Sequence, residues 1–290
     1  MRYPLFLPDG GTIGFVAPSF GCASEPYKTA FIHAQQRFRE MGYRLDLGPN
    51  CYAQEGVGIS NTPEKCGKEL NEYLLTEKAD VLISCGGGEL MCETLDYVDF
   101  KGISEASPKW YMGYSDNTNL TFLLTTLCDT ASIYGPCAGA FGMEPWHESI
   151  QDALELLQGK KLVMKGYDKW EKEAGKCEEN PLVPYQVTEE RILRRFPDAD
   201  SEFSGRLLYG LPGKSVGNAL RQGGGLYPEI SGRWYHMVPG VLRFECICHT
   251  TCHLADAAHR LVLPCKGLSH RPPSGLRTGN DGPGSIPCGV

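Results

Sequence analysis

The chain has 290 residues, a net charge of -7 and 41% hydrophobic residues, which predicts one large or two medium globular domains with a substantial core. The acidic balance argues against nucleic-acid binding by phosphate neutralisation, so no nucleic-acid partner is expected. No window approaches the ~20 apolar residues of a membrane span, and the N-terminus lacks a signal-peptide pattern. We therefore expect a cytoplasmic protein without membrane contact, whose thirteen cysteines are mostly free thiols.

Predicted strands alternate with predicted helices over the first 160 residues. Apolar runs rich in strand-forming residues predict strands at 12–17, 43–47, 79–84 and 109–113. Helical spacing predicts helices at 27–41, 63–77, 119–128 and 150–157. Thr62 is expected to cap the second helix, with Pro63 at its first position. The alternation predicts the α/β class, with an N-terminal parallel sheet covered by helices on both faces.

The chain divides into three predicted parts. Residues 1–165 are expected to form the N-terminal α/β domain. Residues 166–204 are polar, charged and contain proline, which favours a linker or an excursion. Residues 205–290 are expected to begin a C-terminal domain.

Residues 113–117 lie between the predicted strand at 109–113 and the helix at 119–128. A serine hydroxyl becomes a useful nucleophile when a base takes its proton and a positive pocket receives the developing oxyanion. A sharp strand-to-helix turn would expose Ser115 and aim helical N–H groups at the reacting carbonyl. Ser115 is therefore predicted to be a nucleophile, although Asn117 stands where the common elbow pattern has glycine. The alternative is that Ser115 or Asp116 merely caps the helix.

Three glycines at 86–88 directly follow the predicted strand at 79–84. Glycines there let a backbone N–H approach a ligand closely, either as a second oxyanion donor or as a phosphate cradle. The full dinucleotide-binding pattern is missing, because Glu89, Leu90 and Met91 follow. The alternative function is a nucleotide-binding α/β module without hydrolase activity, and a simple tight turn is a third interpretation.

Several segments between about residues 10 and 220 together resemble the LD-carboxypeptidase and microcin C self-immunity family of serine peptidases. These segments are 12–19, 83–89, 113–119, 134–136 and 217–218. The resemblance implies amide hydrolysis by a Ser–Glu–His triad with Ser115 as nucleophile. It also implies an oxyanion hole formed by the backbone amides of Asp116 and of Gly87 or Gly88.

The same resemblance implies small substrates with an amide bond near a free carboxylate. These are peptides such as the L,D-linked murein peptides, or peptidyl-nucleotide conjugates in the microcin-immunity branch. Residues 117–119 lean slightly toward that branch. The family implies no metal and no other cofactor, and a homodimer is compatible with it.

The resemblance stops after about residue 220, where the composition changes. Residues 1–220 have 31 acidic and 21 basic side chains, whereas residues 221–290 have four acidic and seven basic ones, with five of the seven histidines. Residues 234–241 can be encoded so that a one-base shift reads Gly-Ile-Ile-Trp-Tyr-Leu-Glu-Ser, typical of the strand with the family's catalytic glutamate. Three later segments shift into family-like sequence in the same frame. We therefore hypothesise that the chain is out of frame after about residue 220.

Under this hypothesis, neither the triad glutamate nor the triad histidine is identifiable in this sequence. The glutamate codon would straddle Gly240 and Val241, and the histidine would fall beyond residue 290. Catalysis by this chain is then expected to be impaired, because losing the general base costs several orders of magnitude in rate. The Cys- and His-rich residues 246–253 have a spacing that fits no zinc class well, so no metal site is predicted. A zinc-binding protein without enzymatic activity remains a rival.

Overall fold

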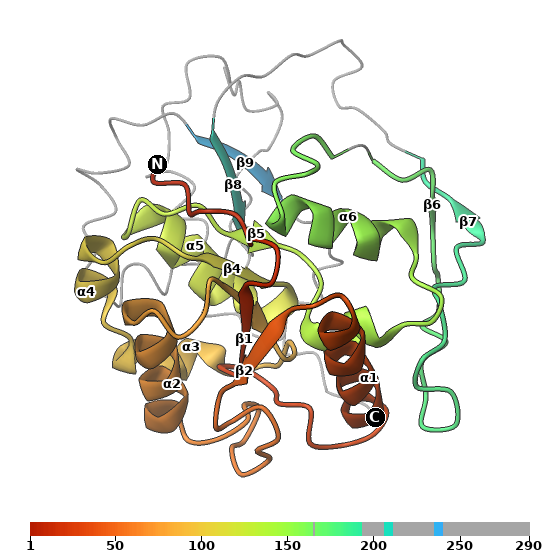
Figure 1. The fold of residues 1–290 in the computed structure, drawn as a ribbon, viewed down its shortest axis with the longest axis horizontal. Helices are drawn as coiled ribbons and strands as arrows, with labels where there is room; N and C mark the ends of the chain where they lie inside the picture. Colours follow the sequence, from red (N-terminus) through yellow and green to blue (C-terminus); the bar gives the residue numbers. More distant parts are fainter. Residues whose placement is uncertain (165, 193–205, 211–234, 240–290) are drawn as a thin grey trace, which may run out of the picture.

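The computed structural model describes residues 1–164, 166–192, 206–210 and 235–239. Its centre is a five-stranded sheet in the order β2-β1-β3-β4-β5, in which all neighbours pair in parallel (Figure 1). The strands are β1 Thr12–Val16, β2 Arg44–Leu47, β3 Val81–Ser84, β4 Trp110–Gly113 and β5 Ile133–Tyr134. The predicted α/β class with a parallel sheet is confirmed.

Helices cover both faces of this sheet, as predicted (Figure 1). The α-helices are α1 Tyr27–Glu40, α2 Pro63–Leu75, α3 Met91–Thr94, α4 Phe100–Glu105, α5 Thr118–Thr126 and α6 Glu148–Leu157. Three short 3-10 helices are η1 Leu95–Tyr97, η2 Ser115–Asn117 and η3 Ala138–Gly142. The predicted boundaries lie within one or two residues of these, and the Thr62 hydroxyl accepts the cap bond from Lys65 N–H at 3.4 Å.

The strand period of two divides the core between the two faces. In β3, Val81 and Ile83 join the cluster under α1 and α6, whereas Leu82 joins the cluster under α2 and α5. Successive strand side chains point to opposite faces, so a continuous apolar run fills both layers. The short helices α3 and α4 were not predicted, because four to six residues give too little periodicity to detect.

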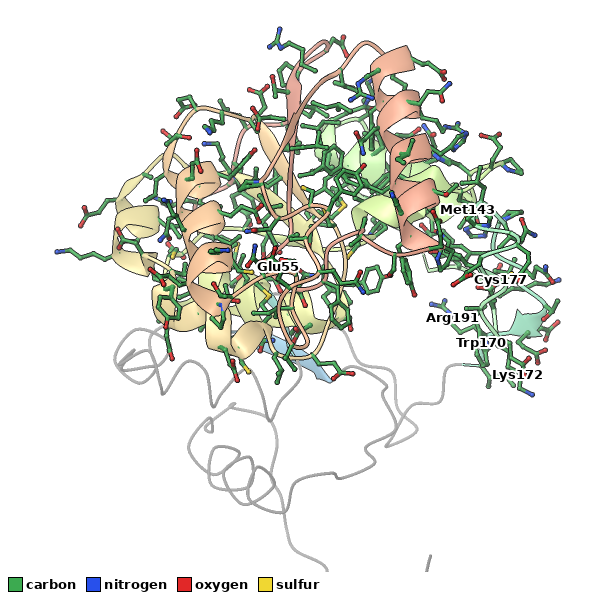
Figure 2. All side chains as sticks on the ribbon, turned by 90° about the horizontal axis from the view of Figure 1, so that it is seen from below. Glu55, Met143, Trp170, Lys172, Cys177 and Arg191 are labelled. Atoms are coloured by element: carbon green, nitrogen blue, oxygen red, sulfur yellow. The ribbon has the colours of Figure 1, made fainter. Side chains whose placement is uncertain are left out.

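Residues 166–192, the described part of the predicted linker or excursion, contain a small two-stranded sheet. Strand β6 Lys169–Trp170 pairs antiparallel with β7 Glu189–Glu190. The backbone N–H of Glu144 donates to Leu182 O at 2.8 Å, which ties the excursion to the segment before α6. Figure 2 shows Trp170, Cys177 and Arg191 together at one side of the molecule, with Glu55 near the middle of the view.

Two further strands are described in the C-terminal part. Strand β8 Arg206–Gly210 pairs in parallel with β9 Tyr235–Pro239, and the sequence analysis had not predicted β9. The cysteine and histidine cluster at 246–253 and the other segments of the frameshift hypothesis lie outside the described residues, so that hypothesis stays a prediction. Within the described ranges, no helix has the length and apolar character needed to cross a bilayer.

Candidate active site

Ser115 lies at a strained turn between β4 and α5. Its φ is +61°, in the left-handed region that residues with a side chain rarely adopt. Ser115 is exposed, whereas the next residues, Asp116 and Asn117, are buried. The Thr118 hydroxyl donates to Ser115 O at 2.5 Å and closes the turn. The turn therefore presents the serine hydroxyl at the surface, which is the geometry expected of a nucleophile on an elbow.

The Ser115 side chain does not cap the following helix. The cap residue of α5 is Asn117, and it makes no side-chain cap bond. Asp116 does accept a backbone N–H, but that of Met91 at the start of α3, not one from α5.

The glycine loop at 86–88 lies directly against Ser115. A Cβ placed on Gly87 would be 3.0 Å from Ser115 Cβ and 3.2 Å from Ser115 Oγ. A Cβ on Gly88 would be 2.1 Å from Ser19 Oγ, so only glycine fits there. Strands β3 and β4 are neighbours in the sheet, and their carboxyl ends therefore meet. The two segments singled out from the sequence come together for this reason.

The Asp116 carboxylate holds three segments around the elbow. Its Oδ2 accepts from Ser19 Oγ and from the backbone N–H of Met91, both at 2.8 Å, and its Oδ1 accepts from Asn119 Nδ2 at 2.8 Å. The side chain is 2% exposed. The sequence predicted a backbone-amide role for Asp116 or a helix cap, and not this side-chain network, whose partner Ser19 is 97 residues away.

Tyr134 is a second residue that sequence reasoning left without a role. Its hydroxyl accepts the backbone N–H of Ser115 at 3.1 Å. The available signal was its position in the segment 134–136, which had been matched to the family without a function. Tyr134 lies on β5, next to β4 in the sheet, so it braces the elbow from the neighbouring strand.

No general base contacts Ser115 within residues 1–164 and 166–192. The two histidines there bond elsewhere: His33 Nδ1 donates to Gly142 O at 2.9 Å, and His147 Nδ1 bonds Ser149. No group of three His, Cys, Asp or Glu residues in these ranges could hold a metal ion. Burial raises the pKa of the neighbouring Cys137 thiol to about 12, so this thiol stays neutral and supplies no base.

Glu69 is a buried carboxyl that supports the loops beside the site. Its side chain, on α2, is 1% exposed and accepts the backbone N–H groups of Ala17 at 2.7 Å and Asn50 at 2.9 Å. Burial raises its pKa to about 7, although both hydrogen bonds lower it. The loop after Ala17 continues to Ser19 and Phe20, which bond Asp116 and Gly87. Glu69 therefore helps to position that loop.

This raised pKa predicts a pH-dependent stability. The folded pKa of Glu69, about 7, lies above its ordinary value of 4.5, so the folded state holds the proton more tightly. The stabilisation is complete below about pH 4.5 and is lost as the pH rises to about 7. Between pH 5 and 8, the free energy of unfolding should fall by about 2 kcal/mol more in the parent than in Glu69→Gln.

Urea unfolding at several pH values measures this difference. Glu64→Gln is the matched control for removing one carboxylate from the same helix, because Glu64 is exposed. Parallel pH profiles for the parent and Glu69→Gln would show that Glu69 does not titrate in this range.

An exposed serine on a strained strand-to-helix turn, with a glycine loop against its hydroxyl, defines the nucleophile-elbow class of α/β sites. The family model described as the LD-carboxypeptidase N-terminal domain matches residues 13–135. The resemblance predicted from the sequence is confirmed, and residues 13–135 are similar to the N-terminal domain of the LD-carboxypeptidases.

Two curated relatives match with similar identity. A carboxypeptidase-type protein of Treponema pallidum is 26% identical over 155 residues, which cover 53% of this chain and 44% of that protein. The microcin C7 self-immunity protein MccF of Escherichia coli is 26% identical over 183 residues, which cover 61% of this chain and 52% of MccF. The chain thus spans about half the length of the curated relatives it matches.

Solved structures show the same fold. MccF in complex with glutamyl sulfamoyl guanosine superposes with a TM-score of 0.59 at 22% identity, over 74% of this chain and 64% of that one. An MccF-like protein from Streptococcus pneumoniae in complex with AMP superposes with a TM-score of 0.65 at 18% identity, over 78% and 71% of the two chains.

Proposed function

We propose that this chain contains the nucleophile-bearing part of a serine-type, carboxypeptidase-like amide hydrolase. The supporting observation is the placement of Ser115 at φ +61° with Gly87 against its hydroxyl. Ser115 would attack the amide carbonyl, and the backbone amides of Asp116 and of Gly87 or Gly88 would stabilise the oxyanion. The substrate would be a small cytoplasmic peptide or a peptidyl-nucleotide conjugate.

The two substrate classes correspond to the two kinds of relative. MccF has been solved with glutamyl sulfamoyl guanosine and with aspartyl sulfamoyl adenosine, which are aminoacyl-nucleoside conjugates. The Treponema relative is described as a carboxypeptidase. We propose that this chain shares the common feature of these classes, an acyl group attached through nitrogen and placed over Ser115.

We further propose that hydrolysis by this chain is impaired. Activation of Ser115 requires a base, and within residues 1–164 and 166–192 both histidines, His33 and His147, bond elsewhere. A test of the site must therefore not depend on turnover.

A cysteine in place of Ser115 provides such a test. Nearby backbone N–H groups and a helix N-terminus stabilise a thiolate and lower its pKa. In Ser115→Cys, the introduced thiol should titrate at least about one unit below the ordinary value of ~8.5. The measurement is the pH dependence of iodoacetamide alkylation, followed peptide by peptide by mass spectrometry.

Exposed Cys177 serves as the reference thiol in the same sample. An introduced thiol that titrates at or above ~8.5 would contradict an oxyanion-binding pocket at Ser115, and with it the proposed function.

A further inference from the structure

Asn117 stands where the common elbow pattern has its second glycine, and both its Nδ2 and its Oδ1 form hydrogen bonds. Its Nδ2 donates to Gly86 O at 2.8 Å and to Tyr114 O at 3.0 Å. Its Oδ1 accepts from the Tyr111 hydroxyl. The residue is 0% exposed. A single amide group thus joins the carbonyls that precede Gly87 and Ser115.

Gly113 makes room for this arrangement. A Cβ on Gly113 would be 2.7 Å from Asn117 Cγ and 2.9 Å from Asn117 Cβ, closer than real side chains allow. The elbow therefore has glycine before the serine and a buried amide after it. The Asn117 side chain, which replaces the glycine of the common pattern, occupies the space that a side chain at position 113 would need.

Peptide planarity makes these contacts relevant to chemistry. In a trans peptide, the C=O of one residue and the N–H of the next point in opposite directions. Gly86 O accepts from Asn117 Nδ2 and also from Ser84 Oγ, the latter at 3.0 Å. The N–H of Gly87 therefore points away from these two donors. Asn117 is buried and the glycine loop is half-buried, so we infer that this N–H is directed toward the exposed side of the loop. Ser115 lies against the same residue, because a Cβ on Gly87 would be 3.0 Å from Ser115 Cβ.

The same amide fixes the peptide before the nucleophile. Because Tyr114 O accepts from Asn117, the Ser115 N–H points the opposite way, and there it donates to the Tyr134 hydroxyl at 3.1 Å. Asn117 therefore fixes two peptide planes together. A glycine at position 117 has no side-chain amide and could fix neither peptide plane.

We propose that Asn117 is a positioning residue that aims the Gly87 N–H at the oxyanion formed on the substrate of Ser115. The proposal rests on the proposed function for the role of that N–H. Asn117 touches no reacting atom and acts through the orientation of the Gly86–Gly87 peptide. It also accounts for an asparagine where the common elbow has glycine.

The thiol introduced by Ser115→Cys reports on this orientation without turnover. Adding Asn117→Ala should raise the pKa of that thiol by at least about half a unit, because the nearby N–H dipole is no longer held. Tyr111→Phe is the matched control, since it removes the hydrogen bonds of the Tyr111 hydroxyl to Asn117 Oδ1 and to Ser84 and leaves both Nδ2 bonds in place. It should leave the thiol pKa unchanged.

A second measurement follows the loop directly in the full chain. The order parameter of the Gly87 amide from ¹⁵N relaxation should fall from about 0.85 to below about 0.6 in Asn117→Ala, and not in Tyr111→Phe. If Asn117→Ala does not fold, Ser84→Ala removes the other donor to Gly86 O and should give a smaller fall in the same order parameter.

The outcomes separate the two proposals. Equal effects of Asn117→Ala and Tyr111→Phe on the thiol pKa, or no effect of either, would overturn the positioning role while the proposed function stands. A thiol with an ordinary pKa in Ser115→Cys alone would overturn the proposed function. In that case the Gly87 order parameter would test whether Asn117 positions the Gly86–Gly87 peptide. An unchanged order parameter in Asn117→Ala would overturn this role.

Discussion

Turnover of an L,D-tetrapeptide or of an aminoacyl-sulfamoyl nucleotide should rise at least about 10³-fold when the codons after residue 220 are read one base forward to the end of that frame. The reason is chemical. Ser115 is placed on its elbow, but its hydroxyl needs a base to take the proton, and under the frameshift hypothesis the triad glutamate and histidine lie in the shifted reading. Loss of the general base alone costs several orders of magnitude.

Initial rates with both substrates measure this prediction, each with and without Ser115→Ala. In the shifted protein, Ser115→Ala should abolish the turnover gained. In the chain as it stands, the same substitution should change little, because little Ser115-dependent catalysis is expected. Robust turnover by the present chain that Ser115→Ala abolishes would show the predicted impairment to be wrong. Stop codons soon after residue 220 in the shifted frame would refute the frameshift hypothesis.

Asp116→Ala should lower the free energy of unfolding by about 3–5 kcal/mol. The carboxylate is buried and accepts from Ser19 Oγ, from the backbone N–H of Met91 and from Asn119 Nδ2. Its removal leaves Ser19 Oγ and the Met91 N–H without this acceptor, whereas Asn119 Nδ2 keeps its bond to Asp116 O at 2.8 Å. Each buried group left without a partner costs about 1–3 kcal/mol. Without the carboxylate, the loop after β1 also loses the hydrogen bond from Ser19 that joins it to the elbow.

Urea unfolding at pH 7 measures this effect, and Ser19→Ala is the matched control. Ser19→Ala removes one of the three donors and keeps the carboxylate bonded to the other two, so it should cost only about 1 kcal/mol. If Asp116→Ala were no more destabilising than Ser19→Ala, the carboxylate would not hold the three segments together.

Local patterns were sufficient to predict the elements that bear the site. The apolar run at 79–84 and the spacing of Ala30, Phe31, Ala34 and Phe38 depend on neighbours within a turn or two, and the structure places β3 and α1 accordingly. Ser115 and the glycine loop were found in the same way, since each is a short motif after an apolar strand. Their roles in catalysis remain proposals.

The contacts that shape the site could not be predicted, because they join residues far apart in the chain. Ser19 and Asp116 are 97 residues apart, and Asn117 and Gly86 are 31 apart. From the sequence alone, Asn117 was only a departure from the common elbow. Its bond to Gly86 O depends on β3 and β4 lying side by side, and no local pattern specifies that neighbourhood.

The sequence by itself thus determined the α/β class, the family resemblance and the candidate nucleophile, because periodicity and short motifs are local properties of the chain. Only the tertiary structure decided what surrounds Ser115. The parallel order β1-β3-β4-β5 places four carboxyl ends next to one another, and the residues after them then meet. Asp116, Asn117 and Tyr134 acquire partners in this way, and burial is the reason that each of the bonds made by Asp116 and Asn117 matters.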